Sequence, residues 1–409
     1  MKGMGLKHYR MSIAWPRIMP TGSLPLNNAG IAFYDRLFTA LVEAEIEPAV
    51  TLYHWDLPQA LEDSMGGWLN ESIVTYFHDF ADFCMSYFGP KYGIKTWITF
   101  NEPLTFVNLG YSEGTHAPGR CTDCRNGGDS SQEPYMVAHN VLLAHAAAVN
   151  TYKTKYQEDQ GGQIGLTVNS VWGEPLDPSN ASSVAAAERF LEFELAWFAD
   201  PLFFGEYPDS MVKRVGDRLP TFTSEQKELV QGSYDFLGLN HYTSKYIDDS
   251  GSSGGTSWAD DCGTTSYTTD LNGDAIGPSS DSSWLKVVPW GFRKQVNWVA
   301  GRYNNPSIII TENGVSCPGE TELDLTDALN DTFRVSFYQQ YLGNLSLAIS
   351  EDGANVKGYF AWSLMDNFEW TDGYKVRFGM HYVDYDDGMM RFAKESARWY
   401  KEVMAANGW

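Results

Sequence analysis

Apolar residues along the chain follow two alternating patterns, one with the period of a strand and one with the period of a helix. Residues 97–100 form a short β-branched and aromatic run, and residues 307–311 form an even more apolar one. Short apolar runs bounded by turn residues are typical of buried strands. Segments such as 31–44 place apolar side chains three and four positions apart, as an amphipathic helix does. The pattern therefore predicts strands that alternate with helices.

This alternation occurs seven times along the chain. The predicted strands are 8–15, 47–56, 97–100, 163–169, 236–242, 307–311 and 356–363. The predicted helices are 31–44, 72–88, 135–152, 184–198, 291–303, 327–349 and 392–404. Strict alternation favours a parallel sheet covered by helices. Both an open doubly wound sheet and a closed (β/α)8 barrel satisfy this pattern.

Polar and aromatic residues at the strand ends distinguish the two arrangements. They are Arg10, His54, Asn101, Glu102, Asn169, Asn240, Tyr242, Glu312 and Trp362. An open sheet binds its ligand at one switch point, whereas a barrel brings all its strand ends to one mouth. We therefore predict an α/β fold, a (β/α)8 TIM barrel. Seven units are one too few, so we expect strand 1 to be missing and the chain to begin at the second unit.

A single domain is predicted over residues 1–409, because no change of composition marks a boundary and barrels of this class are long single units. The segment at about 248–283 is rich in Gly, Ser, Thr and Asp and shows no hydrophobic period. Such composition is typical of a loop. We predict that this segment is a surface loop inserted at the mouth of the barrel.

The amino-acid composition of the chain argues against some classes of binding partner. The chain is 43% hydrophobic, which is ample for a large core, and its formal charge of −23 argues against binding nucleic acid or an anionic membrane surface. No run of about 18 apolar residues exists that could span a membrane. The first eight residues lack the apolar segment of a secretory signal. We expect a small-molecule ligand, and the sequence predicts neither a compartment nor an oligomeric state.

The cysteine pattern does not indicate a metal site or a redox-active pair. There are five, and Cys121 and Cys124 form an isolated C-x-x-C in Gly- and Asp-rich sequence. Zinc sites usually need a second pair, and a redox motif of the thioredoxin type opens a helix after a strand. We therefore expect a loop disulfide or two free thiols at this position.

Two glutamates, Glu102 and Glu312, each follow a buried strand. Two carboxyl groups in one pocket suit glycoside hydrolysis, in which one protonates the leaving oxygen while the other attacks or activates water. Arg10 is the candidate that keeps the nucleophile charged. Two other interpretations are open at this point. The glutamates could be solvated or cap the next helix, and His54 with Asp56 could belong to a metal site, although His54 has no second histidine four residues away.

The aromatic residues at the strand ends have two possible roles. They are Trp55, Tyr242, Trp362 and Trp370. Large aromatic side chains commonly fill a barrel core. Here each of them lies beside polar residues in the sequence, as Trp370 does beside Glu369. A flat ring next to a carboxylate suits a sugar, which has one apolar face and a rim of hydroxyl groups.

Longer motifs run nearly from end to end of the chain. They are YRMSIAWPRI at 9–18, TLYHWDLP at 51–58, TFNEP at 99–103, APGR at 117–120, EPYMVAHN at 133–140, TENG at 311–314 and AWSLMDNFEW at 361–370. In these motifs the chain resembles glycoside hydrolase family 1, the β-glucosidase family. The resemblance implies a (β/α)8 barrel without a metal or other cofactor. It also implies that a β-glucoside or oligosaccharide loses its terminal non-reducing β-D-glucosyl residue by double displacement, with retention of configuration.

The resemblance also implies a role for individual residues. Glu102 is the expected acid/base, Glu312 the nucleophile, and Asn101 the partner of the sugar's 2-hydroxyl. The other expected sugar contacts are His54, Trp55, Tyr242, Trp362, Glu369 and Trp370, with Trp362 as the platform under the ring. Arg10 and Tyr242 match the pair that positions and tunes the nucleophile. Trp172 and Trp284 fall where the family shapes its aglycone site.

Two further expectations concern the substrate and one concerns activity. Family members that hydrolyse thioglucosides without a protein acid have glutamine at the position of Glu102. The glutamate in this chain therefore argues against that type of enzyme. Glu369 would repel a phosphate, so an unphosphorylated sugar is expected. The family's first unit carries a glutamine that bonds the sugar's 3- and 4-hydroxyls, and this sequence has no such residue. The alternative hypothesis is therefore a truncated barrel that binds sugar and is catalytically weak or inactive.

Overall fold

The computed structural model describes residues 1–251 and 255–408. Within them, seven parallel strands form one sheet in the order β1-β2-β3-β4-β6-β9-β10. The strands are β1 (His8–Ser12), β2 (Glu47–Tyr53), β3 (Thr96–Asn101), β4 (Gln163–Asn169), β6 (Phe236–Asn240), β9 (Ile308–Glu312) and β10 (Val356–Tyr359). All seven predicted strands are confirmed. Because they are parallel neighbours, their carboxyl ends lie at the same edge of the sheet.

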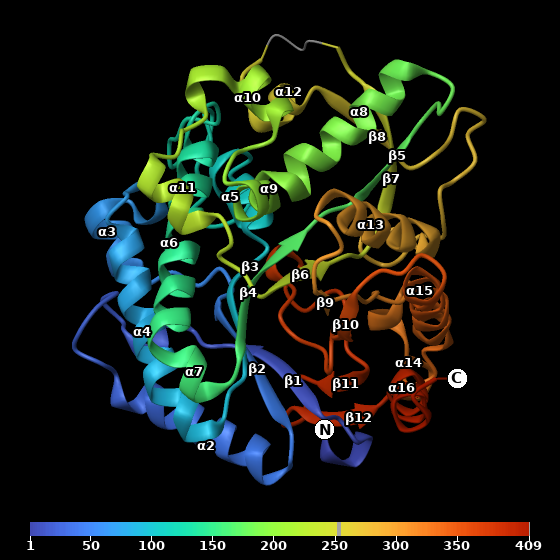
Figure 1. The fold of residues 1–409 in the computed structure, drawn as a ribbon. Coiled ribbons are helices and arrows are strands. Elements are labelled where there is room, and N and C mark those ends of the chain that lie inside the picture. The colour runs from blue at the N-terminus through green and yellow to red at the C-terminus, as the bar shows by residue number, and fades with distance from the viewer. Residues whose placement is uncertain (252–254, 409) are drawn as a thin grey trace.

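Helices connect successive strands and surround the sheet, as Figure 1 shows for α2, α4 and α6 on one side and α13, α15 and α16 on the other. The longer helices are α2 (Asn28–Glu43), α4 (Ile73–Tyr92), α5 (Pro103–Tyr111), α6 (Glu133–Thr151), α8 (Ala181–Leu191), α9 (Trp197–Phe204), α13 (Pro289–Arg302), α15 (Thr332–Ser350) and α16 (Glu395–Ala406). The shorter ones are α1 (Trp15–Ile18), α3 (Gln59–Met65), α7 (Gln157–Gln160), α10 (Asp209–Val215), α11 (Ser224–Val230), α12 (Trp258–Cys262) and α14 (Leu325–Ala328). None of the described helices is long and apolar enough to cross a membrane.

The predicted loop at 248–283 contains regular structure, so that prediction is wrong for part of the segment. Helix α12 and strand β8 (Thr264–Tyr267) lie inside it. Strand β8 pairs antiparallel with β7 (Ser244–Asp249), and β7 pairs with β5 (Trp172–Pro175) to give a small second sheet. Strand β8 is short and its two ends are polar, so the sequence shows too little periodicity to reveal it. Residues 252–254 of the predicted loop lie outside the described residues.

Three predicted elements near the C-terminus have different bounds in the structure. The last strand of the sheet ends at Tyr359, so Trp362 lies in the loop that follows. The helix predicted at 327–349 is interrupted after α14, and α15 begins at Thr332. The helix predicted at 392–404 begins only at Glu395, because β12 (Met390–Ala393) pairs with β11 (His381–Asp384). Residues 392 and 393, which the pattern assigns to the first turn of a helix, are the end of a hairpin strand.

The hydrophobic core joins elements from nearly the whole chain, with buried side chains from Met4 to Tyr400. Its aromatic part is dense between β1 and α4, where Trp15 stacks on Phe80 with ring centroids 5.3 Å apart. The helices that cover the sheet therefore hold the strands, and the residues at the strand ends, in fixed relative positions.

A buried network of six charged residues ties the C-terminal part to the loop after β9. Its members are Glu320, Asp331, Arg334, Asp366, Arg377 and Lys394, all at most 8% exposed. Arg334 pairs with Asp331 and with Glu320, and it also donates to the Val315 carbonyl at 3.1 Å. Lys394 pairs with Glu320 and with Asp366. Because Val315 follows β9 closely, the network braces the segment that carries Glu312.

We expect Arg334→Met to lower the free energy of unfolding by about 3–5 kcal/mol, because Asp331 and Glu320 would remain buried without their partner. Urea denaturation followed by circular dichroism measures this. Arg398, whose ion pair with Glu395 is about half exposed, is the control. Arg398→Met should cost less than about 1 kcal/mol. Equal losses in the two variants would contradict the role of the network.

Candidate active site

Glu102 lies directly after β3, at the start of α5. Its backbone is in the left-handed region, with φ 46°, and Pro103 begins the helix. A non-glycine residue adopts this conformation only where its surroundings impose it. The carboxyl group is buried and accepts from Asn240 Nδ2 at 2.7 Å and from Thr105 Oγ1 at 2.9 Å. Burial and, after it, the negative charge of Glu312 raise the pKa of Glu102 to about 7.

Glu312 is the last residue of β9, and its carboxylate is 4% exposed. Arg10 Nη1 donates to Oε1 at 2.6 Å, and the Tyr242 hydroxyl donates to Oε2 at 2.7 Å. Burial and the charge of Glu312 raise the pKa of Tyr242 well above its usual value, so the phenol remains a donor. Each oxygen of this carboxylate is thus held by one donor, the charged guanidinium of Arg10 in β1 or the neutral hydroxyl of Tyr242 in the loop after β6.

A chain of hydrogen bonds connects the two carboxyl groups. Arg10 also donates to Asn101 Oδ1 at 2.6 Å, and Asn240 Nδ2 donates to that same oxygen at 3.2 Å. Asn240 in turn accepts from Thr311, the neighbour of Glu312, at 2.6 Å. Glu102 and Glu312 are therefore placed relative to each other by side chains of β1, β3, β6 and β9. Asn240 was recognised at a strand end, but its positioning role was missed.

The two carboxyl groups have different electrostatic environments. Glu312 is paired with the Arg10 guanidinium, whereas Glu102 is bonded by a neutral amide and a neutral hydroxyl. Opposite charge favours an ionised carboxylate, and burial without a cation favours a protonated one. This division, in which one buried carboxyl group is bonded only by neutral donors and the other is paired with a cation, is the pattern of an acid paired with a nucleophile.

Aromatic rings and a further carboxyl group stand beside this pair. His54 stacks on Trp362 and on Trp370, with centroids 6.2 and 5.9 Å apart, and Trp55 packs on Trp370 at 4.2 Å. Burial lowers the pKa of His54 to about 4, so its ring is neutral, and it bonds Asn101 at 3.1 Å. Burial and then the charge of Glu312 raise the pKa of Glu369 to about 8.

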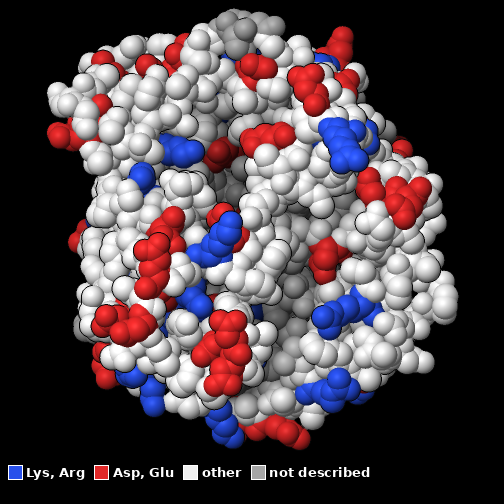
Figure 2. Space-filling view, turned by 180° about the vertical axis from the view of Figure 1, so that it is seen from behind, with Lys and Arg blue, Asp and Glu red and all other residues white. Residues whose placement is uncertain are grey.

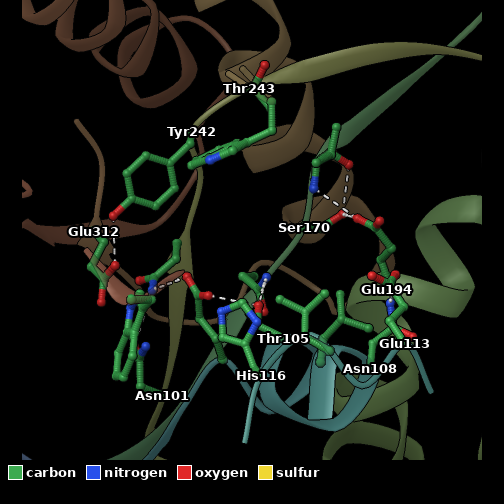
Figure 3. A pocket seen from close by; sticks show the side chains of 18 of the residues that line it. Asn101, Thr105, Asn108, Glu113, His116, Ser170, Glu194, Tyr242, Thr243 and Glu312 are labelled. Atoms are coloured by element: carbon green, nitrogen blue, oxygen red, sulfur yellow. Dashed lines mark hydrogen bonds between the residues drawn. The ribbon is translucent and has the colours of Figure 1, made fainter. Parts of the chain in front are cut away.

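These groups line one cavity of about 710 Å³. The predicted site residues that line it are His54, Trp55, Asn101, Glu102, Tyr242, Trp284, Glu312, Trp362, Glu369 and Trp370. Arg10 lies behind Glu312 and does not line the cavity. Trp172 is not among the lining residues, and its indole N–H donates to Glu174 Oε2 at 2.8 Å in the small sheet, so its role at the aglycone site stays a prediction. Figure 3 shows Tyr242 and Glu312 on one side of this cavity.

The cavity is also lined by residues that the sequence motifs do not indicate, among them Asn108, Glu113, Glu194 and Lys245. Asn108 is in α5 and Glu113 follows it, and this helix was not predicted. Pro103 was a usable signal, because proline favours the first position of a helix. For Glu194 the signal was an acidic residue inside an apolar helical run.

The loop after α5 contains the C-x-x-C motif, and Cys121 and Cys124 form a disulfide with an S–S distance of 2.03 Å. This confirms the disulfide and excludes two free thiols. The Cys124 sulfur lies 3.8 Å from the Glu113 carbonyl, so the bridge holds the loop against the rim of the cavity. Among the described residues, no group of three or more His, Cys, Asp or Glu side chains could hold a metal ion.

On the face of the molecule in Figure 2, Lys and Arg side chains are interspersed with Asp and Glu over a mostly uncharged surface. A continuous basic patch, which nucleic-acid binding favours, is not seen among the described residues on that face. The other faces are not part of that view.

Comparison with known proteins places the chain among glycosidases. Residues 1–409 match the sequence model of glycosyl hydrolase family 1. The chain is 48% identical to β-glucosidase 12 of Oryza sativa subsp. indica over 418 positions, which cover 99% of this chain and 80% of that protein. It is 47% identical to β-glucosidase 40 of Arabidopsis thaliana, with the same coverage.

The solved structures to which this chain is similar include β-glucosidases, as do the relatives found by sequence. A rice β-glucosidase mutant in a covalent complex with Glc superposes with a TM-score of 0.95 at 46% identity, covering 98% of this chain and 85% of that one. A β-glucosidase of the fungus Humicola insolens in complex with glucose has a TM-score of 0.95 at 44% identity, covering 99% and 85%.

Proposed function

The chain belongs to glycosyl hydrolase family 1, and from this membership we propose that Glu102 and Glu312 catalyse its reaction as acid/base and nucleophile. The chain has the family's (β/α)8 TIM-barrel fold. It is a retaining β-glucosidase, as its relatives and structural neighbours indicate. One observation supports this assignment of residues. The carboxyl groups of Glu102 and Glu312 are both buried in one cavity and are connected by hydrogen bonds, and only that of Glu312 is paired with a guanidinium.

In the first step a Glu312 oxygen attacks the anomeric carbon, and the bond from that carbon to the glycosidic oxygen breaks. Glu102 gives its proton to the departing oxygen, so the aglycone leaves as a neutral alcohol or phenol. The glucosyl group is then covalently bound to Glu312. Arg10 and Tyr242 hold the nucleophile in place, and the raised pKa of Glu102 keeps the required proton available.

In the second step Glu102, now a carboxylate, takes a proton from water while the water oxygen attacks the anomeric carbon. The bond to Glu312 breaks, and the free sugar leaves with its original configuration after two inversions. Asn101 binds the 2-hydroxyl, where a hydrogen bond that tightens in the transition state lowers the barrier. Its side chain is oriented for this by Arg10 and Asn240.

The resemblance to the family assigns the remaining sugar contacts, and the cavity lining is consistent with them. His54, Glu369 and Trp370 bind the 3-, 4- and 6-hydroxyls, and Trp362 is the platform under the ring. Trp55 supports Trp370 by ring packing and holds the Asn101 carbonyl through its indole N–H at 2.9 Å. Trp284, at the rim, contacts the aglycone.

We infer one catalytic domain over 1–409, because a single core joins both ends of the described chain. That the family's first βα unit is absent stays a prediction. The relatives and structural neighbours do not favour the alternative of a weak or inactive sugar-binding barrel. Hydrolysis of nitrophenyl β-glucoside by the purified chain distinguishes an active enzyme from that alternative. Turnover supports the proposed function. A protein that melts cooperatively but shows no turnover would favour the inactive barrel.

The pH profile tests the role of Glu102. Only its protonated form can donate to the leaving oxygen, so kcat/KM should fall as the pH rises through about 7. Glu369, with a pKa of about 8, is another carboxyl group of the cavity that could cause this decline, the alkaline limb of the profile. The limb should persist in Glu369→Gln and disappear in Glu102→Gln. A limb that remains in Glu102→Gln would contradict the assignment.

A substrate comparison tests the role of Glu369. We expect kcat/KM for a plain aryl β-glucoside to exceed that for its 6-phosphorylated form by about a hundredfold or more, because a buried phosphate would lack a partner. Among the described residues that line the cavity, Lys245 is the only Lys or Arg. Its charge acts on Glu113 and Glu194, which Figure 3 shows on the side of the cavity opposite Glu312. Faster hydrolysis of the phosphorylated substrate would overturn this expectation.

A further inference from the structure

Two hydrogen-bonded side chains, Thr105 and Asn169, connect Glu102 to strand β4. Thr105 lies one turn further along α5, and its hydroxyl donates to Glu102 Oε2 at 2.9 Å. Asn169 is the last residue of β4, and its Nδ2 donates to the hydroxyl oxygen of Thr105 at 2.8 Å. All three residues line the cavity, and Figure 3 shows Thr105 with its hydrogen bonds. Asn169 therefore reaches Glu102 through Thr105.

The direction of these hydrogen bonds follows from the atoms that make them. An amide nitrogen can only donate, so the Thr105 oxygen accepts from Asn169. An ionised carboxylate can only accept, so the single hydroxyl proton of Thr105 points to Glu102 when Glu102 is ionised. Asn240 Nδ2 donates to the other carboxyl oxygen, Oε1, at 2.7 Å. Both of these side chains therefore donate to Glu102, an arrangement that favours the carboxylate over the acid.

The side chain of Asn169 has no second hydrogen bond. Its Oδ1 is buried and has no partner among the described residues. If the amide were turned over, Oδ1 would face Thr105 and would take the hydroxyl proton away from Glu102. The backbones are fixed beside each other, because the Glu102 N–H donates to the Thr167 carbonyl of β4 at 3.0 Å. The orientation of the Asn169 amide thus decides whether Thr105 donates to Glu102.

We propose that Asn169 is a positioning residue that directs the Thr105 hydroxyl proton onto Glu102 and so stabilises the carboxylate that acts as base in the second step. This inference rests on the proposed function. The first step needs Glu102 as an acid and the second needs it as a base, whereas burial alone favours the acid. Burial and then the charge of Glu312 raise the pKa of Glu102 to about 7, and the hydrogen bonds from Asn240 and Thr105 lower it.

Four other ionisable groups interact electrostatically with Glu102. Glu312 in β9 raises the pKa of Glu102, and Arg10 in β1 lowers it. The charge of Glu102 in turn raises the pKa of Tyr242, in the loop after β6, and that of Glu369, in the loop after β10. The substitutions below alter neutral side chains only. A shifted pH profile therefore reports a lost hydrogen bond and not a removed charge.

Two pH profiles of the whole chain test the inference. The alkaline limb of kcat/KM for an alkyl β-glucoside reports Glu102 as the acid. The acid limb of kcat for dinitrophenyl β-glucoside reports Glu102 as the base, because this leaving group departs without a proton and leaves the second step limiting. In Thr105→Val, which keeps the size of the side chain, both limbs should move to higher pH by about one unit, the scale of one lost hydrogen bond to a charged group. On its acid limb, kcat should then be about tenfold lower than in the wild type.

The Asn169 variant shows whether the amide acts through Thr105. In Asn169→Leu both limbs should move in the same direction by about half a unit, because Thr105 keeps its hydroxyl but loses its fixed orientation. The double variant should match Thr105→Val alone, since the amide has nothing to orient once the hydroxyl is gone. Thr105→Ser keeps the hydroxyl and should keep the wild-type limbs. Thr75→Val, at an exposed position of α4, is the matched control and should also leave them unchanged.

Thermal melting shows which variants fold, and Asn169→Ala replaces Asn169→Leu if the larger side chain prevents folding. Limbs that stay at the wild-type pH in the Asn169 variant overturn the inference, as do shifts that add up in the double variant. A lower plateau with unmoved limbs would show a purely structural role and would overturn it too. An alkaline limb that remains in Glu102→Gln instead overturns the proposed function, so the two failures are distinguishable.

Discussion

Glu312→Ala is expected to lower kcat for nitrophenyl β-glucoside by on the order of 10⁵-fold, the scale seen when a hydrolase loses its covalent nucleophile. No other described carboxylate is held by both Arg10 and Tyr242, so nothing can take its place at the anomeric carbon. The substrate should still bind, because His54, Glu369 and Trp370 are unchanged. Steady-state kinetics at saturating substrate measures the effect.

The control for this variant is Glu322→Ala, which removes an exposed glutamate in the loop after β9. It should leave kcat within about twofold, the range of a surface substitution away from special features. Thermal melting of Glu312→Ala shows whether the fold survives. A folded Glu312→Ala protein that keeps a tenth or more of the wild-type kcat would exclude Glu312 as the nucleophile.

Glu102→Gln should have an effect that depends on the leaving group. For a substrate with a poor leaving group, such as an alkyl β-glucoside, kcat/KM should fall by about 10²- to 10⁴-fold, because the departing oxygen receives no proton. Dinitrophenolate leaves without protonation, so for dinitrophenyl β-glucoside the first step should be nearly unchanged. The second step should be slow in both cases, because no base activates the water.

Pre-steady-state kinetics separates these steps. With dinitrophenyl β-glucoside, Glu102→Gln should release a rapid burst of dinitrophenolate followed by slow turnover. Azide, a nucleophile that needs no base, should accelerate the slow phase. Equal losses for both leaving groups would assign the acid role to another residue.

The sequence predicts the sheet well because its five central strands, β2, β3, β4, β6 and β9, are buried on both faces. The apolar run Ile308–Ile310 can only be a core strand, and β4 has the predicted bounds 163–169. The pair of carboxyl groups that we propose as catalytic can be identified in the sequence for a related reason. Glu102 and Glu312 interrupt apolar runs abruptly, and the cost of burying a carboxyl group implies that each has a specific partner.

Elements that depend on distant contacts were not predictable. Strand β8 is polar and exists because it pairs with β7, and the start of α16 is set by the β11–β12 hairpin. Trp172 was assigned to the aglycone site by resemblance alone, and its side chain is bonded to Glu174. The placement of Glu194 requires the three-dimensional course of a π-helical turn, which no local pattern specifies.

Covalent trapping tests the double displacement on Glu312 most directly. Glu102→Gln is mixed with dinitrophenyl β-glucoside, quenched in acid during the slow phase and digested, and the peptides are analysed by tandem mass spectrometry. We predict a mass gain of one glucosyl unit on the peptide that contains Glu312, with fragmentation assigning it to that residue. A glucosyl group on a different residue, or continued turnover with no covalent adduct, would contradict the account.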